Sequence, residues 1–276
     1  MIDEAHGSVT PSYTTILNQL GLTPRETPIP LVGLTATPFR GGAEDAGPET
    51  VRLVRRYGGR RFDHGVFGDD GSYPLLRRMG VLSDAEFARL DGVPLELSEP
   101  ELEQFRQFDR LPPNVEARIG RDHGRNDRII DRIAGLPSEW ATLVFAASVD
   151  HAELLAAELS VRGIAAQAVS SRTDAAARRH AIEAFRRNEI QVLTNYGVLT
   201  TGFDAPKTRA VFVTRPIYSP GLYQQVVGRG LRGPANGGTD SCLIVNVADN
   251  LEQYGTELAF LEFEDLWRRV RGGPLY

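Results

Sequence analysis

Residues 141–169 read ATLVFAASVDHAELLAAELSVRGIAAQAV, and this stretch predicts the fold of the chain. The apolar run Ala141–Ala146 has the length of a buried strand. Ser148 is a typical helix N-cap, the Leu- and Ala-rich segment after it has helical spacing, and Gly163 is a typical terminator. A second apolar run, Ile164–Val169, follows at once. Strand, helix and strand in this order predict a right-handed crossover between parallel strands.

The same alternation continues through the C-terminal half of the sequence. A helix is predicted over about Thr173–Arg187, with Ile182 and Phe185 facing inward. Three more strands are predicted at Ile190–Thr194, Ala210–Thr214 and Ser241–Val247. Strands that alternate with helices of about ten to fifteen residues predict an α/β fold, with a parallel sheet flanked by helices. Ligands bind such sheets at the carboxyl ends of the strands.

The sequence ahead of residue 141 gives weaker patterns. A helix is predicted over Pro11–Leu22, ending at Gly21, and Leu31–Leu34 has the composition of a buried strand. Further on, we predict helices at Val51–Tyr57, Ser83–Leu90 and Glu99–Phe108, and a strand at Phe62–Phe67. The acidic run Glu96–Glu103 and the basic run Arg118–Arg128 are interpreted as solvated faces. A phosphate backbone is the alternative partner of the basic run.

Composition limits the class of protein. A length of 276 residues and a hydrophobic content of 41% allow one large or two modest domains. A lone cysteine, Cys242, excludes an internal disulfide framework and a cysteine-rich zinc site, which fits a cytoplasmic location. No apolar run is long enough to span a membrane. The net charge of −5 gives no global attraction to nucleic acid, so such binding needs a local groove.

The stretch Ser219–Gly233, SPGLYQQVVGRGLRG, is predicted to be one helix with Ser219 as its N-cap and Gly233 just past its end. The polar face of this helix would carry Gln225, Arg229 and Arg232. The opposite, buried face would carry Tyr223, Val227 and Leu231. Two planar guanidinium groups beside a glutamine suit a polyphosphate. The alternative is an ordinary amphipathic helix with solvated arginines.

The glycines of this stretch also match the G-x-G-x-x-G spacing of a dinucleotide site. The three glycines are Gly228, Gly230 and Gly233, with Asp249 downstream. Such a site needs a strand before the glycines and a helix opening on the last one. Here a helical pattern precedes them and a proline- and glycine-rich loop follows, so we interpret the match as accidental.

Two further groups of polar residues lie in the N-terminal segment. Asp3 and Glu4 are adjacent carboxylates that, at the carboxyl end of a buried strand, would bind Mg²⁺ and position a water. A solvated pair is the alternative, because only two residues precede Asp3 and strands usually have about five or six. Thr35 and Thr37 place two hydroxyls at the end of a predicted strand, or in an ordinary turn before proline.

Taken in order, five segments resemble motifs II to VI of the superfamily 2 helicases of the DEAD/DEAH-box type. They are IDEAH, TATP, LVFAASVDHAELLAAEL, VLTNYGVLTTGFDAP and QQVVGRGLR. LVGLTATPFR and YQQVVGRGLRG are most similar to the branch of RadD-like repair helicases and the translocating subunits of restriction enzymes. The resemblance covers about residues 1–40 and 138–250. It implies a remnant of a first RecA-like domain at 1–137 and a complete second RecA-like domain at 138–250. The apolar residues after Asn250, Leu258, Leu261, Phe263 and Trp267, predict a helical tail at 251–276 that packs back on the domain.

The resemblance also implies roles at an ATP site between two RecA-like domains, which close on ATP and Mg²⁺ while nucleic acid crosses both. Asp3 would bind Mg²⁺ and Glu4 would orient the attacking water. His6, Thr35 and Thr37 would couple hydrolysis to domain movement.

Further roles fall on the C-terminal motifs. Gly202 and Asp204 would lie at the ribose side of the nucleotide. Arg229 and Arg232 would reach the γ-phosphate as arginine fingers, with Gln225 beside them. Ser148 and Thr194 would face the nucleic-acid backbone, with DNA as the favoured partner.

One family motif does not occur in this sequence. Superfamily 2 enzymes carry G-x-x-x-x-G-K-[ST] ahead of the DEAH motif, where backbone amides and the lysine hold the phosphates. The chain's lysine, Lys207, follows motif V instead. We therefore expect a helicase fragment that is inactive alone, or one half of a split enzyme whose P-loop lies on a separate chain. The competing hypothesis is a non-catalytic nucleic-acid-binding or partner-docking module.

Overall fold

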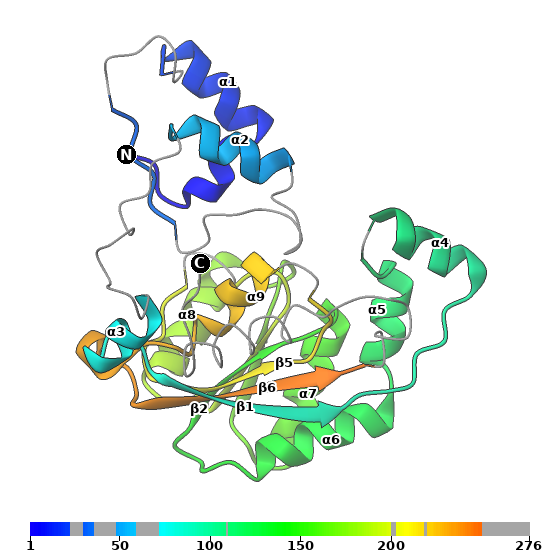
Figure 1. Ribbon diagram of the computed structural model, residues 1–276. Helices are drawn as coiled ribbons and strands as arrows, with labels where there is room; N and C mark the ends of the chain where they lie inside the picture. Colours follow the sequence, from blue (N-terminus) through cyan, green and yellow to red (C-terminus); the bar gives the residue numbers. More distant parts are fainter. Residues whose placement is uncertain are drawn as a thin grey trace.

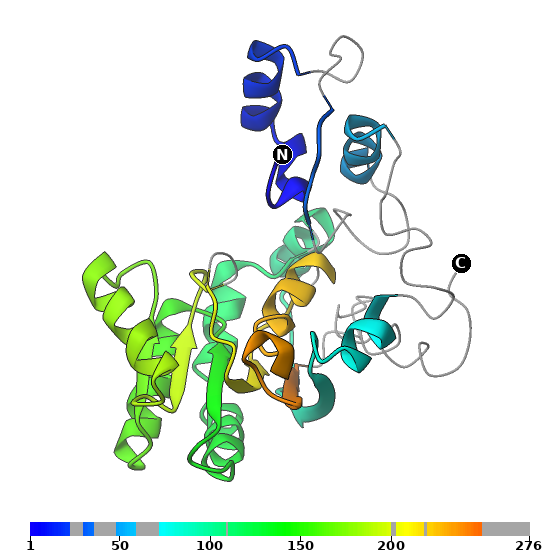
Figure 2. The same cartoon turned by 90° about the vertical axis from the view of Figure 1, so that its left-hand side faces the viewer.

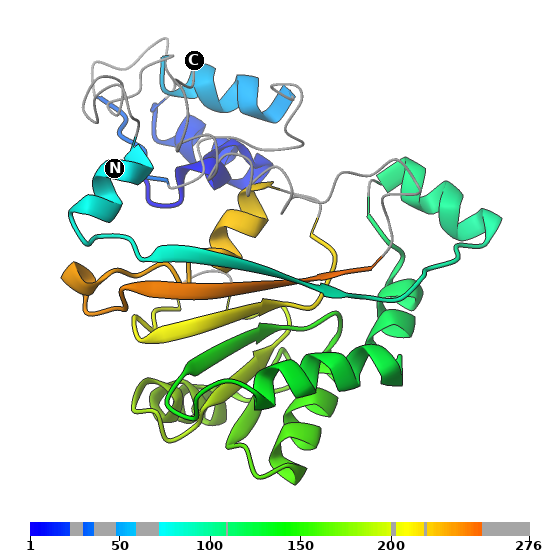
Figure 3. The ribbon, with the colours of Figure 1, turned by 60° about the horizontal axis from the view of Figure 1, so that its bottom comes forward.

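The computed structural model describes residues 1–22, 30–35, 48–58, 72–108, 110–199, 203–217 and 220–249, and its centre is a parallel sheet (Figure 1). Six strands lie in the order β1-β6-β5-β2-β4-β3, which Figure 3 shows from below. They are β1 (Asp84–Asp91), β2 (Ala141–Phe145), β3 (Ala166–Val169), β4 (Val192–Asn195), β5 (Thr208–Val213) and β6 (Ser241–Ala248). Every neighbouring pair is parallel, so the predicted α/β fold with a parallel sheet is confirmed.

Helices cover both faces of the sheet, as crossovers between parallel strands require. α6 (His123–Ala134) and α7 (Val149–Val161) lie on one face, and α8 (Ala175–Arg186) and α9 (Pro220–Val227) lie on the other (Figure 1). Side chains alternate along each strand, so Val144 belongs to the core under α6 and α7, whereas Leu143 and Phe145 belong to the opposite core. That second core also receives side chains from α4 (Glu99–Phe108) and α5 (Pro113–Gly120).

Capping side chains determine where the central helices begin. The Ser148 hydroxyl accepts a hydrogen bond from the His151 backbone N–H at 3.1 Å, which confirms it as the N-cap of α7. Asp174 does the same for α8, accepting from two backbone N–H groups of its first turn at 2.9 Å. Gly163 follows α7 with a φ of +81°, a conformation that glycine adopts without steric cost.

The N-terminal segments form a small unit that lies apart from the sheet (Figure 2). Both predicted helices of this region are present, as α1 (Pro11–Gln19) and α2 (Pro48–Arg56), so these predictions are confirmed. The short helix η1 (Ala5–Val9) contacts both of them. Leu31–Leu34, predicted as a buried strand, instead makes one isolated parallel bridge, between Gly33 and Ile2. This segment is only half-buried or exposed, because no further described strand pairs with it. A side chain at Gly33 would overlap Ala5 and Tyr57, so only glycine fits there.

The segment Ser83–Leu90 was predicted to be helical, and that prediction is wrong. It forms strand β1, which pairs along its whole length with β6. Ala85 and Phe87 pack against one core of the sheet, while Ala88 and Leu90 pack against the other. The apolar spacing fits a helix as well as a strand, and the backbone groups of β6 favour the strand because they need partners. The division at 137/138 stays a prediction, although β1 brings residues from before it into the sheet.

Two short elements complete the described structure. α3 (Ser72–Arg78) and η2 (Pro234–Asn236) come together where the chain enters β1, and the Ala235 N–H donates to the Gly80 carbonyl at 2.9 Å. The predicted strand Phe62–Phe67 and the predicted helical tail 251–276 lie outside the described residues. Among the helices that are described, none combines the length and the apolar character needed to cross a membrane.

Candidate ATP-side and nucleic-acid sites

The helix predicted over Ser219–Gly233 ends earlier than its pattern indicates. α9 stops at Val227, and the N–H groups of Arg229 and Gly230 bond to carbonyls three residues back, at 3.2 and 2.9 Å. Arg232 then forms an antiparallel bridge with Leu82. In this turn Gly230 lies directly against Cys242 and Val211, where any side chain would overlap them. The N-cap residue Ser219 lies outside the described part of the chain.

The predicted packing stripe survives this early end of the helix. Tyr223, Val227 and Leu231 are all buried, with exposed fractions of 1, 0 and 4%. The Tyr223 hydroxyl donates a hydrogen bond of 2.9 Å to Oδ1 of Asn246 on β6. This face therefore fixes α9 to the sheet and leaves its polar face turned away from the core.

The two arginines of the stretch converge on the segment Phe203–Asp204, although they do not share a helix face. Arg229 donates through Nη1 to the Phe203 carbonyl, and Arg232 Nε lies 3.2 Å from Oδ1 of Asp204. Both partners of the second pair are exposed, with side-chain exposures of 41 and 61%. Burial, and next the charge of Arg232, lower the pKa of Arg229, while Glu4 and Asp204 oppose the shift. Glu4 thus acts on Arg229 from the N-terminal unit.

His6 connects the N-terminal unit to α9. Its Nδ1 lies 3.0 Å from Oγ1 of Thr35 and 3.4 Å from Oε2 of Glu4, and its Nε2 lies 3.3 Å from Nε2 of Gln225. Because the Gln225 amide nitrogen can only donate, His6 Nε2 accepts and Nδ1 carries the proton. Three predicted site residues therefore meet at the His6 imidazole, and two of them, Thr35 and Gln225, are far from His6 in the sequence.

The acidic pair before His6 is exposed and locally ordered. Oδ1 of Asp3 accepts the Glu4 backbone N–H at 2.9 Å, and Glu4 has a φ of +49°. Within the described residues, no group of three or more metal-binding side chains occurs. One or two carboxylates are enough for Mg²⁺ that is held chiefly by substrate phosphates, so Asp3 fits that ion.

Two other predicted site residues, Thr37 and Gly202, lie outside the described residues.

The two residues predicted to face nucleic acid have different environments. Ser148 is partly exposed and uses its hydroxyl to cap α7. Thr194 is completely buried, and its hydroxyl donates to the Ala152 carbonyl at 2.7 Å. A direct contact between the Thr194 side chain and nucleic acid is therefore excluded in this conformation, because the hydroxyl joins β4 to α7. A contact with Ser148 stays a prediction.

The basic run Arg118–Arg128 contains a residue that the sequence interpretation missed. Arg125 was assigned to a solvated face, but it is fully buried and forms a bidentate pair with Asp249, Nε–Oδ1 2.7 Å and Nη2–Oδ2 2.8 Å. Its Nη2 also donates to the Thr214 carbonyl at 2.9 Å. Its spacing could have predicted this burial, because Arg125 precedes the buried Ile129 by four residues and so lies on the same face of the helix.

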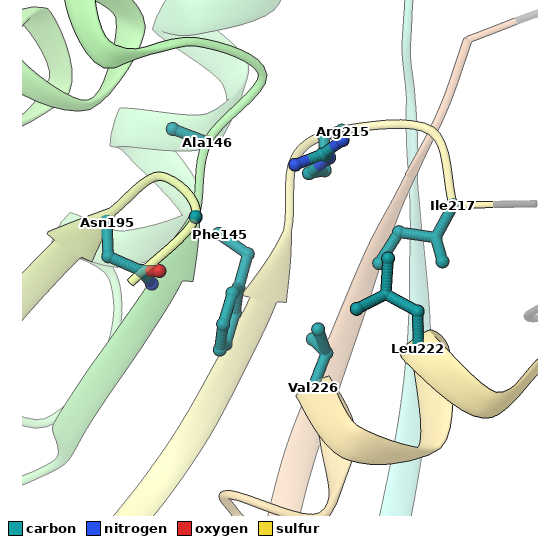
Figure 4. A pocket seen from close by; sticks show the side chains of 8 residues that line it. Phe145, Ala146, Asn195, Arg215, Ile217, Leu222 and Val226 are labelled. Atoms are coloured by element: carbon teal, nitrogen blue, oxygen red, sulfur yellow. The ribbon is translucent and has the colours of Figure 1, made fainter. Parts of the chain in front are cut away.

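A cavity opens where the strand order reverses, between the carboxyl ends of β2 and β5 (Figure 4). Its volume is about 20 Å³, enough for one water. The lining residues come from the ends of three strands and from α9: Phe145, Ala146, Asn195, Gly197, Arg215, Ile217, Leu222 and Val226. The chain leaves β2 towards one face of the sheet and leaves β5 towards the other face. In open α/β sheets, ligands bind at the point where the connections diverge in this way. Sequence reasoning did not identify Arg215 or Asn195.

Part of the chain matches a known protein family. Residues 126–233 match the family described as the helicase conserved C-terminal domain. The matched range contains β2 to β5, α9 and both arginines of the candidate site. The chain therefore carries a helicase C-terminal domain.

Two curated relatives are helicases by name, and the chain is homologous to both. It is 26% identical over 246 residues to "Putative ATP-dependent helicase IRC3" of Saccharomyces cerevisiae, covering 89% of this chain and 33% of the yeast protein. It is 27% identical over 253 residues to "Putative mitochondrial ATP-dependent helicase irc3" of Schizosaccharomyces pombe, covering 92% and 38%. The chain thus spans about one third of the length of these relatives.

Solved structures show the same fold. A fragment of a "putative HsdR subunit of a type I restriction enzyme" from Vibrio vulnificus has a TM-score of 0.56 at 18% identity, covering 88% of this chain and 47% of that one. Dbp5 of S. cerevisiae bound to RNA and ADP BeF3 has a TM-score of 0.52 at 14% identity, covering 97% and 62%. The sheet is therefore RecA-like, as the sequence resemblance implied.

Proposed function

We propose that this chain supplies the second motor domain, and part of the first, of an ATP-dependent helicase or translocase that acts on DNA. The observation that carries the proposal is the contact of His6 with both Thr35 and Gln225. Residues from three separate motifs share this one imidazole. Such a link is what coupling between a nucleotide site and domain movement requires, because a change at one partner alters the proton and the position offered to the others.

The proposal assigns the ATP side to the groups around this imidazole. Asp3 would hold Mg²⁺, which neutralises developing charge on the phosphates, and Glu4 would orient water for attack. Arg229 and Arg232 would bind the γ-phosphate, and Asp204 with Gly202 would lie on the ribose side. The present partners of Arg232 and Asp204 support such a use, because their exposed ion pair is weak and exchanges readily for a polyphosphate.

The experiment compares residues 1–276 alone with the same chain joined or mixed with a P-loop-bearing polypeptide. Alone, the chain is expected to show no DNA-stimulated ATPase, because positioning and charge stabilisation are nearly all of phosphoryl-transfer catalysis. With the P-loop restored, Arg232→Ala is expected to lower turnover by about 10³-fold or more. Arg172→Ala is the matched control, because Arg172 is exposed and pairs with Asp150 and Glu153 on α7.

Two outcomes would reject this function. Turnover by the chain alone that Glu4→Gln abolishes would imply a phosphate site that the proposal lacks. Reconstituted ATPase that survives Arg232→Ala would remove the arginine-finger assignment and favour a nucleic-acid-binding or partner-docking module. A cytoplasmic location also stays a proposal, and one relative is named mitochondrial.

A further inference from the structure

Arg215 occupies the switch point of the sheet without a strong internal partner. It follows the end of β5 and lines two cavities at that edge. Its guanidinium carbon lies 5.1 Å from the centre of the Tyr196 ring, and its Nη2 lies 3.5 Å from Oε1 of Glu116 on α5. Its Nε is buried and has no hydrogen-bond partner among the described residues. A buried donor without an acceptor costs free energy, so this position is not optimal for the side chain.

The same protein shows what a structural arginine pair looks like. Arg125 and Asp249 are fully buried and bidentate, with both contacts below 3 Å. The Arg215–Glu116 pair is longer, makes one contact, and leaves 24 and 13% of the two side chains exposed. The Arg125 pair is bidentate and short, although Arg125 Nη1 also lacks a partner among the described residues, whereas Arg215 holds its carboxylate through a single longer contact of Nη2.

A second buried polar group lies at the same place, and its unpaired atom is an acceptor that suits a donor such as a water or a base N–H and not a phosphate oxygen. Asn195 is fully buried and donates through Nδ2 to the Val144 carbonyl at 3.0 Å, but its Oδ1 has no partner among the described residues. This side chain lines the cavity beside Arg215 (Figure 4). An unpaired acceptor and an underused cation therefore border one opening. The Tyr196 ring lies against the Arg215 guanidinium.

From this arrangement we propose that Arg215 binds a phosphate of single-stranded nucleic acid, and that Glu116 is an internal anion displaced when the phosphate binds. The proposal rests on the proposed function and adds a contact residue and its regulation. A phosphodiester matches the fork of Arg215 better than the distant carboxylate, and Tyr196 supplies an aromatic surface of the kind that bases stack on. In the free protein Glu116 weakens non-productive binding of other anions.

The environment of Glu116 agrees with a displaceable anion. Burial raises the pKa of its carboxyl, and the charge of Arg215, the Tyr196 hydroxyl and Arg110 oppose that shift only in part. The ionised carboxylate is thus less stable here than in water, even with Arg215 beside it. Neutral glutamine at this position is therefore expected to leave the melting temperature unchanged.

The experiment measures the affinity of the full chain for a fluorescent oligodeoxythymidine as a function of salt. Glu116→Gln is expected to tighten binding about two- to fivefold, the effect of removing one partly exposed ion pair. Arg215→Ala is expected to weaken binding and to lower the slope of log K against log salt by about 0.7, the value for one phosphate contact on a single strand. In the Arg215→Ala background, Glu116→Gln should have no effect.

Glu189→Gln is the matched control. It makes the same change in net charge. Glu189 pairs with Arg187 between the end of α8 and the amino end of β4, whereas Glu116 and Arg215 lie at the carboxyl ends of the strands. ATP without oligonucleotide is the second ligand. The affinity of the chain for ATP should be the same in the wild type and in Glu116→Gln. This comparison distinguishes binding of a nucleic-acid backbone phosphate from binding of a nucleotide phosphate.

Four results would overturn the inference: equal effects of Glu116→Gln and Glu189→Gln, a large fall in melting temperature for Glu116→Gln, oligonucleotide binding that ignores Arg215, or no binding by either the wild-type chain or Glu116→Gln. Each can occur while reconstituted ATPase still depends on Arg232, so failure here is distinguishable from failure of the proposed function.

Discussion

Replacing Arg125 by alanine is expected to be among the most destabilising single changes in the chain. The side chain has no exposed surface, and its three hydrogen bonds, at 2.7, 2.8 and 2.9 Å, join α6 to Asp249 and to the Thr214 carbonyl. Its loss leaves the Asp249 carboxylate buried without its counterion. Removing one partner of a buried pair costs about 3–5 kcal/mol, most of which is the cost of the stranded charge. The carboxyl ends of β5 and β6 should loosen together.

Urea unfolding followed by circular dichroism tests this reasoning. With an m value of about 2–3 kcal/mol/M, the midpoint should fall by about 1–2 M. The double variant Arg125→Met/Asp249→Leu should recover about half of the loss or more, because apolar side chains replace a buried ion pair well when both charges go. Arg162→Ala, which breaks the exposed pair of Arg162 with Asp131 on α6, should leave the midpoint unchanged. A small loss for Arg125→Ala, or a double variant that is worse than the single one, would refute the argument.

Three further predictions follow from other contacts. Gly230→Ala should destabilise the fold by about 1–3 kcal/mol through overlap with Cys242 and Val211, and adding Cys242→Ala should restore part of that loss in thermal unfolding. Burial, and next the charge of Arg125, lower the pKa of His151 from 6.5 to about 3, so the unfolded state binds a proton that the folded state refuses between these values. The stability that neutral His151 contributes is therefore complete above pH 6.5 and declines as the pH falls towards 3, by at most about 1.4 kcal/mol per pH unit. The urea midpoints at pH 7 and pH 5 should differ less in the His151→Gln variant than in the wild-type chain. An equal difference in both proteins would contradict this. Arg232→Ala should change stability by no more than about 0.5 kcal/mol, because its pair with Asp204 is exposed, and a larger loss of melting temperature would make the residue structural.

Parts of the candidate site could be predicted from local sequence, but their convergence could not. The motif residues Glu4, His6, Thr35 and Gln225 were identified singly, and their meeting at one imidazole depends on how the N-terminal unit packs against α9. Arg215 was missed for a related reason. It belongs to no periodic pattern, and its importance comes from the reversal of strand order, a property of the sheet as a whole.

The strand and helix alternation from Ala141 to Ala248 could be predicted from local sequence, because apolar runs, N-caps and terminal glycines act within a few residues of one another. Tertiary structure decided three features that local pattern left open or indicated wrongly. Residues 84–91 became a strand because β6 offered unpaired backbone groups. α9 ended at Val227, and the turn that follows packs Gly230 against Cys242 on β6. Arg125 was buried because its counterion lies 124 residues away, a distance at which no periodicity in the sequence can report a contact.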